Sequence, residues 1–116
     1  MIVRQADLFK GWTKVDNHVT TNKKISDGAF RLYAYYSGLR HGDNFVDKYV
    51  IKGLGISKQV LTKRRKELKD ADLICVDQIA ARIYVIYIGN TRMSASRFKI
   101  QFEKEERDRA AIEQKD

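Results

Sequence analysis

The sequence contains no proline, one cysteine and two histidines, and each scarcity argues against a class of protein. One cysteine cannot form an internal disulfide, so the chain is unlike the small secreted domains that disulfides hold together. Cys75 lies in the apolar run LICV, which favours a small buried hydrophobe over a nucleophile. His18 and His41 are far apart and have no second ligand at metal-site spacing, so no metal is expected.

Long apolar runs and catalytic motifs are missing as well. No stretch approaches the roughly eighteen apolar residues of a membrane span, and the start MIVRQADLFKGW carries charge too early for a signal peptide. We therefore expect a cytoplasmic protein that does not enter a membrane. The chain has no Gly-rich phosphate loop, no carboxylate pair in an apolar setting and no Ser–His or Cys–His set. Hence we expect no enzymatic activity, no cofactor and no small-molecule substrate.

What the chain does contain is positive charge, unevenly spread. Its 116 residues suit one domain with a modest core, and the net charge is +8. Residues 103–116 hold six acids and four bases, so residues 1–102 carry +10. A folded domain this basic commonly binds a polyanion. Charge alone fits DNA, RNA, a membrane surface or an acidic protein.

Three helices are predicted between residues 26 and 72. The first begins at Ser26, a plausible N-cap followed by an acid, and ends near residue 39. The second covers about 46–54 and ends at Gly55, where a left-handed backbone carries no steric cost. Its expected buried positions are Val46, Tyr49, Val50 and Leu54.

The third helix begins after Ser57, whose hydroxyl can accept the backbone N–H of Gln59 or Val60. Leu61 and Leu68 form its inner line, and Asp72 closes it. Six cations and two acids lie between residues 58 and 70. At 100° per residue the side opposite the leucines holds Gln59, Lys63, Lys66 and Asp70, with Thr62 on one shoulder.

The remaining segments predict a small sheet. LICV and RIYVIYIG, separated by DQIAA, are typical of an antiparallel hairpin. Both faces of the second strand are apolar, so another element must cover the side away from the helices. The alternating FKIQF at 98–102 is expected to be a strand that does so, before a charged helix or tail. Residues before 26 are read as a lead-in in which 14–19 could form a short strand. The clustered tyrosines (33, 35, 36, 84 and 87) are expected to pack in the core rather than to stack on bases.

LGIS at 54–57, Leu61, Leu68 and ADLI at 71–74 together resemble the winged helix-turn-helix family. The upstream stretch, WTKVDNHVTTNKKISDGAFRLYAYYSGL, is similar to plasmid and phage replication initiators and DnaD-like primosome proteins. The resemblance implies an α+β, mainly α fold: a three-helix core with a C-terminal antiparallel β-hairpin wing. The expected parts are a lead-in (1–25), this domain (26–89) and an extension (90–116).

Two positions depart from the family pattern. Arg65 stands where the family usually has an apolar residue, so either its stem packs while its head reaches solvent, or the helix is slightly rotated. Asp72 replaces the usual glycine, and Asp tolerates a left-handed backbone better than most residues. The wing tip offers only Gln78 and Arg82, with Asp77 opposing them, so the third helix is expected to supply most of the affinity.

These features predict a protein that reads duplex DNA with residues 57–70 in the major groove. Such a protein would be a transcriptional regulator or a replication-module protein of a phage or plasmid-type element. A homodimer through the hairpin or the C-terminal segment would add specificity. The alternative is a winged-helix adaptor that binds proteins. The expected DNA contacts are Ser57, Lys58, Gln59, Thr62, Lys63, Arg64, Arg65, Lys66, Lys69 and Arg82.

Overall fold

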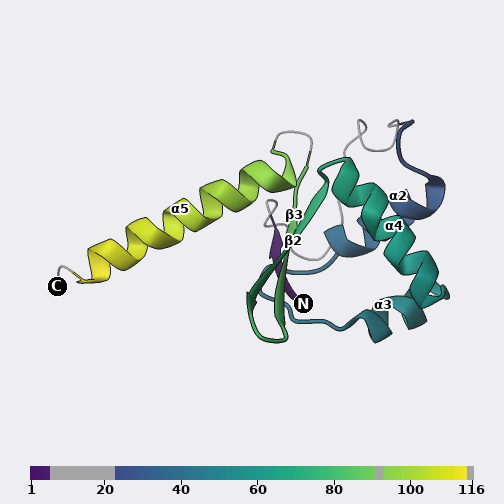
Figure 1. The fold of residues 1–116 in the computed structure, drawn as a ribbon, viewed down its shortest axis with the longest axis horizontal. Coiled ribbons are helices and arrows are strands. Elements are labelled where there is room, and N and C mark those ends of the chain that lie inside the picture. Colours follow the sequence, from purple (N-terminus) through teal and green to yellow (C-terminus); the bar gives the residue numbers. More distant parts are fainter. Residues whose placement is uncertain (6–22, 91–92, 115–116) are drawn as a thin grey trace.

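The computed structural model of the protein describes residues 1–5, 23–90 and 93–114. The lead-in strand expected at 14–19 lies outside these ranges. In chain order the elements are β1 (Ile2–Gln5), α2 (Asp27–Ser37), α3 (Asp47–Leu54), α4 (Lys58–Asp70), β2 (Ile74–Ala80), β3 (Ile83–Ile88) and α5 (Ala95–Gln114) (Figure 1). None of the helices in this part of the chain is long and apolar enough to cross a membrane.

The sheet has three strands in the order β1-β3-β2. β2 and β3 form the expected antiparallel hairpin, in which Ile74 pairs with Ile88. β1 adds to the other edge of β3 in parallel, with Ile2 opposite Val85. The side chain of Gln5 is buried and donates to the carbonyl oxygens of Tyr36 and Leu39, both at 2.8 Å, which fixes the end of β1 against α2.

The prediction of a winged helix-turn-helix fold with a C-terminal hairpin wing was wrong. The described residues form a mixed α+β fold with four helices, in which the hairpin lies mid-chain and a helix comes last. Both edges of β3 are paired, so the hairpin is part of a three-stranded sheet and not a free wing. The four residues of β1 are too few to show a recognisable period, and this strand was missed.

The strand expected at 98–102 is also wrong, because these residues belong to α5. Phe98 and Phe102 would lie on the same face of a strand, and they also lie about one turn apart on the same face of a helix. FKIQF therefore fits both the strand period and the helix period. In α5 the two rings contact Tyr87, with centroid separations of 5.8 and 6.1 Å. A cover for the second face of β3 was correctly expected, but a helix provides it. Beyond this contact α5 projects away from the domain (Figure 1).

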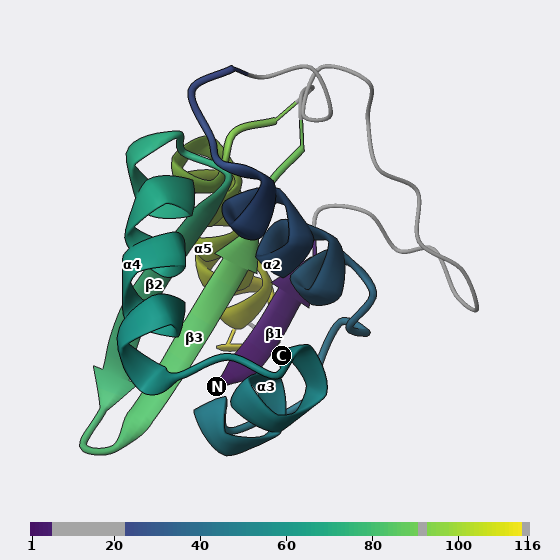
Figure 2. The ribbon, with the colours of Figure 1, turned by 90° about the vertical axis from the view of Figure 1, so that its right-hand side faces the viewer.

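The main core lies between the sheet and the helices α2, α3 and α4, which cover one face while α5 covers the other (Figure 2). Leu61 and Leu68 face this core as expected. In α3, Val50 and Leu54 are buried, but Val46 is 52% exposed and Tyr49 is 63% exposed. The prediction that these last two are buried was wrong, because only one narrow side of α3 meets the rest of the domain.

The expected start and stop signals of the helices are confirmed. Ser26 accepts the backbone N–H of Ala29, and Ser57 accepts that of Val60. Gly55 has φ 65° and Asp72 has φ 56°, both left-handed. The Asp72 carboxylate also accepts the backbone N–H and the hydroxyl of Ser96, at 2.9 and 2.5 Å. An aspartate in place of glycine therefore closes α4 and anchors the first turn of α5.

Candidate nucleic-acid interface

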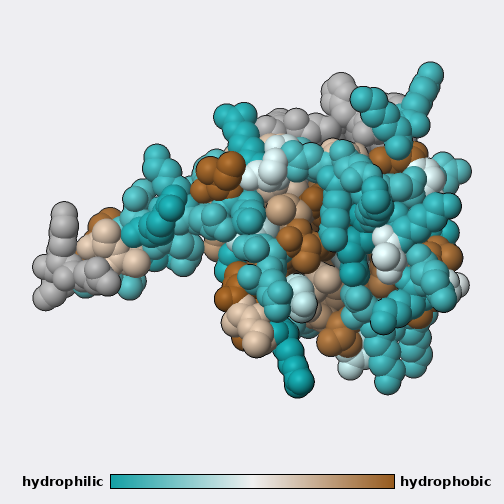
Figure 3. Space-filling view, viewed as in Figure 1, coloured by the Kyte–Doolittle hydropathy of each residue, from teal (hydrophilic) through white to brown (hydrophobic). Residues whose placement is uncertain are grey.

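The outward face of α4 is polar along its whole length. Leu61 and Leu68 are 1% and 0% exposed, which fixes the rotation of the helix. The side chains on the opposite side and its shoulder are all exposed: Lys58, Gln59, Thr62, Lys63, Lys66, Lys69 and Asp70. Hydrophilic side chains dominate this side of the molecule in Figure 3. The helical period therefore located the exposed face of α4 correctly.

Only some of these side chains are free to contact a ligand. Lys66 forms an i,i+4 ion pair with Asp70 at 2.9 Å, and this hydrogen bond raises the pKa of the Lys66 ammonium. The Thr62 hydroxyl donates to the carbonyl oxygen of Lys58 at 3.0 Å, so its methyl group and lone pairs remain available. Within the described ranges Lys58 and Lys63 form no ion pair. Like Lys69, which also forms no ion pair in the described part of the chain, they are exposed cations free to bind phosphate.

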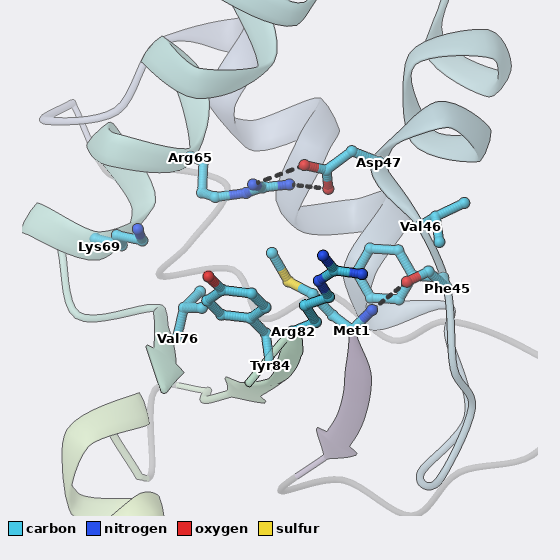
Figure 4. Close-up of a pocket in the computed structure, with 9 residues that line it drawn as sticks. All are labelled: Met1, Phe45, Val46, Asp47, Arg65, Lys69, Val76, Arg82 and Tyr84. Carbon is cyan, nitrogen blue, oxygen red and sulfur yellow. Dashed lines mark hydrogen bonds and ion pairs between the residues drawn. The ribbon is translucent and has the colours of Figure 1, made fainter. Parts of the chain in front are cut away.

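Arg65, one of the expected DNA contacts, is held by side chains of two other helices. Its guanidinium donates to both carboxylate oxygens of Asp47, at 2.6 and 3.2 Å (Figure 4). It also donates to the Tyr36 hydroxyl, at 2.9 and 3.1 Å. Burial acts to lower the pKa of Arg65, but the hydrogen bonds to Asp47 and Tyr36 outweigh it and the pKa is raised. The side chain is 12% exposed and joins α4 to α3 and α2.

This arrangement explains how an arginine can occupy a largely buried position of α4. The stem of Arg65 occupies the interior position, while the head finds fixed partners on two other helices. Neither solvent exposure of the head nor rotation of α4 is needed. The pairing of Arg65 with Asp47 was not predicted, since nothing in the local sequence reveals a partner eighteen residues away.

The side of α4 that faces α2 carries one acid, Glu67, which hydrogen-bonds to the start of α2. Glu67 accepts the hydroxyl and the backbone N–H of Ser26, at 2.9 and 3.3 Å. Arg64 is half-buried and lies over Gly28, where an added Cβ would be 2.3 Å from its Nε. Arg64 and Glu67 thus connect α4 to the start of α2, and the outward face keeps its basic character.

A pocket of about 460 Å³ lies between the C-terminal half of α4, the start of α3 and the hairpin. Three of the expected contacts line it: Arg65, Lys69 and Arg82 (Figure 4). The remaining lining residues are Met1, Phe45, Val46, Asp47, Val76 and Tyr84. Tyr84 is 43% exposed, so the prediction that it packs in the core was wrong. The pocket could not be predicted from the sequence, because its walls come from four separate segments of the chain.

Among the residues that the structure describes, no group of three or more His, Cys, Asp and Glu side chains is arranged to hold a metal ion. Cys75 is half-buried, and burial raises the pKa of its thiol. The interface is thus a surface of hydrogen-bonding and cationic groups beside one open pocket. Comparison of the chain with protein-family models, curated proteins and solved structures finds no significant match.

Proposed function

We propose that the protein binds duplex DNA by placing the exposed face of α4 in the major groove, without catalysis. The observation that supports this most is the face itself: one helix carries an uninterrupted row of exposed polar and cationic side chains, with its apolar line fixed in the core. The major groove is about 12 Å wide and admits one such helix.

The exposed residues suit the two kinds of contact that DNA offers. Gln59 presents an amide that can pair with the edge of a base, while Lys58 and Lys63 suit phosphates. Thr62 retains a methyl group for contact with thymine. The short turn at Gly55 and the ion pair of Arg65 with Asp47 hold α4 at a fixed angle to α3, which a groove-reading helix requires.

One copy presents few groove-facing residues, so we propose that a second copy or a partner protein completes recognition. The hairpin carries Ile79 and Ile83, which are 51% and 43% exposed and suit a dimer contact. The C-terminal segment is the other candidate surface. Resemblance of the sequence to replication initiators supports a regulatory or replication role in a phage or plasmid-type element, and with it a cytoplasmic location.

The test is a titration with a random duplex of about 30 base pairs, matched single strand and duplex RNA, between about 50 and 200 mM salt. We expect preference for duplex DNA and an affinity that falls steeply as salt rises. The double variant Lys63→Glu, Lys66→Glu should lower the duplex affinity at least about tenfold. The double variant Arg97→Glu, Lys104→Glu makes the same charge change on the exposed surface of α5 and should have much less effect. Equal effects of the two double variants would contradict the α4 assignment.

An adaptor that binds another protein is the second candidate. Exposed apolar side chains favour it: Val46 and Tyr49 at the start of α3 are 52% and 63% exposed, and Ile79 and Ile83 of the hairpin are exposed as well. Sequence-specific duplex binding at physiological salt would exclude an adaptor without DNA activity. Absence of binding to every nucleic acid at low salt would favour it.

A further inference from the structure

The pocket between α4 and the hairpin contains cationic groups that the fold does not use. Arg65 and Asp47 neutralise each other on one wall. Lys69 and Arg82 also line the pocket, and within the described ranges the side chain of neither forms an ion pair or a hydrogen bond. Figure 4 shows Lys69 and Arg82 on opposite sides of the pocket, with the Tyr84 ring between them. Two free cations therefore flank an accessible aromatic ring.

Arg82 is held in a backbone conformation that its side chain does not favour. It has φ 64° in the two-residue turn between Ala80 and Ile83, where glycine or asparagine would be relaxed. No hydrogen bond or ion pair within the described part of the chain holds the Arg82 guanidinium. Backbone strain at a residue whose side chain makes no hydrogen bond or ion pair within the fold is often found where residues contact ligands.

The walls also supply apolar surface. Val46 is 52% exposed and Tyr84 is 43% exposed, and both line the pocket together with Phe45 and Val76. The volume of about 460 Å³ lies in the range of small-molecule sites, roughly 300–1,000 Å³. A ligand that fits has a flat ring to lie on Tyr84 and an anionic group to reach a cation at the side of that ring.

We propose that this pocket binds a nucleoside monophosphate unit, with its base on Tyr84 and its phosphate on Arg82 at one side of the ring. The choice of a nucleotide over another aromatic anion rests on the proposed DNA binding, since the pocket opens beside the exposed face of α4. Two sources carry this chemistry: a free nucleotide, or the unpaired 5′-phosphorylated end of a strand whose duplex part lies on α4.

The experiment measures binding of thymidine 5′-monophosphate, thymidine and inorganic phosphate to the full chain by NMR chemical-shift titration. A second arm compares a blunt duplex with the same duplex carrying one unpaired 5′-phosphorylated nucleotide. Tyr84→Ala should weaken nucleotide binding about tenfold or more, since stacking on an aromatic ring contributes strongly. Tyr49→Ala removes an exposed tyrosine outside the pocket and should leave binding unchanged.

Arg82→Gly separates ligand binding from folding. Glycine relaxes the left-handed turn, so this variant should be at least as stable as the parent by thermal unfolding. Its affinity for the nucleotide should nevertheless fall about fivefold or more, through loss of one phosphate contact. Full nucleotide affinity in Arg82→Gly would overturn the assignment of the phosphate to this residue.

The outcomes separate the two proposals. Binding of the free nucleotide, or tighter binding of the overhanging duplex alone, supports the pocket and identifies its source. Binding of the blunt duplex with no response to nucleotide or overhang overturns the pocket and leaves the proposed function intact. Nucleotide binding without any duplex binding supports the pocket and overturns the proposed function. Inorganic phosphate that binds as tightly as the nucleotide overturns the role of Tyr84.

Discussion

Replacing Arg65 by methionine should destabilise the protein more than any exposed charge change on α4. Methionine keeps an unbranched stem of similar length and removes the guanidinium, so the Asp47 carboxylate and the Tyr36 hydroxyl lose their donor. Breaking a fully buried pair by removing one partner costs about 3–5 kcal/mol. The Asp47 side chain is 37% exposed, so water can take over part of the interaction. Hydrogen bonds to charged groups contribute about 1.5–3 kcal/mol, and we expect a loss of about 2 kcal/mol.

Urea unfolding followed by circular dichroism measures this loss. Arg65→Met, Asp47→Asn and the double variant form a cycle in which the coupling energy should be about 1–2 kcal/mol. For a domain of this size the single variant should lower Tm by roughly 8 °C. Lys66→Met is the control, because it breaks an ion pair whose two side chains are 75% and 66% exposed and should change stability little.

A coupling energy near zero would refute the conclusion that Arg65 clamps α4 to α3. So would equal effects of Arg65→Met and Lys66→Met. If Arg65 contacted phosphate directly, Arg65→Met would keep its stability, and the salt dependence of DNA binding would fall by about one counterion. The two measurements therefore distinguish a structural role of Arg65 from the phosphate contact first expected of it.

Three further predictions concern the fold. Gly55→Ala should destabilise by about 1–2 kcal/mol in urea unfolding through backbone strain alone, since no atom lies within 4 Å of the added Cβ; no change would contradict the left-handed turn. Phe102→Ala should lower the free energy of unfolding by about 1–3 kcal/mol, because the Phe102 ring of α5 packs on Tyr87 of β3. The loss should be smaller than for a fully buried ring, since Phe102 is half-buried. A neutral result in thermal unfolding would mean that α5 is not docked on the sheet. Burial raises the pKa of Tyr36 above its ordinary 10.0, so the stabilising effect of its protonated form is complete below pH 10.0 and is lost as pH rises through the raised value. Tyr36→Phe should flatten this alkaline decline in urea unfolding between about pH 9 and 11, and an unchanged decline would assign it to other groups.

Local signals allowed most of the helical part of the fold to be predicted. Ser26, Gly55 and Ser57 act within one turn of the chain, and the structure confirms all three. The sheet was harder because β1 pairs with a strand more than eighty residues away, and FKIQF satisfies two periods at once. Such pairings are decided by tertiary contacts rather than by nearby residues.

In the candidate site too, features set by nearby residues were predictable and features set by tertiary contacts were not. The exposed face of α4 was predictable because a helix with two fixed inward leucines has one possible outward side. The partnership of Arg65 with Asp47 and the exposure of Tyr84 were not, since each depends on how α3 and the hairpin approach α4. The pocket therefore appeared only when these elements were assembled.

The parallel pairing of β1 with β3 also sets the order in which the chain can fold. β1 cannot join the sheet until residues 85–88 have been synthesised. Before that, its only backbone partners among the described residues lie at 42–45, along its other edge. The helices α2, α3 and α4 and then the hairpin can form from contacts nearer in sequence. Closure of the long loop by β1 is then expected as a late step, which buries Val3 and Gln5. In a ribosome-bound chain that stops before residue 85, the edge of β1 that pairs with β3 in the complete domain would be exposed.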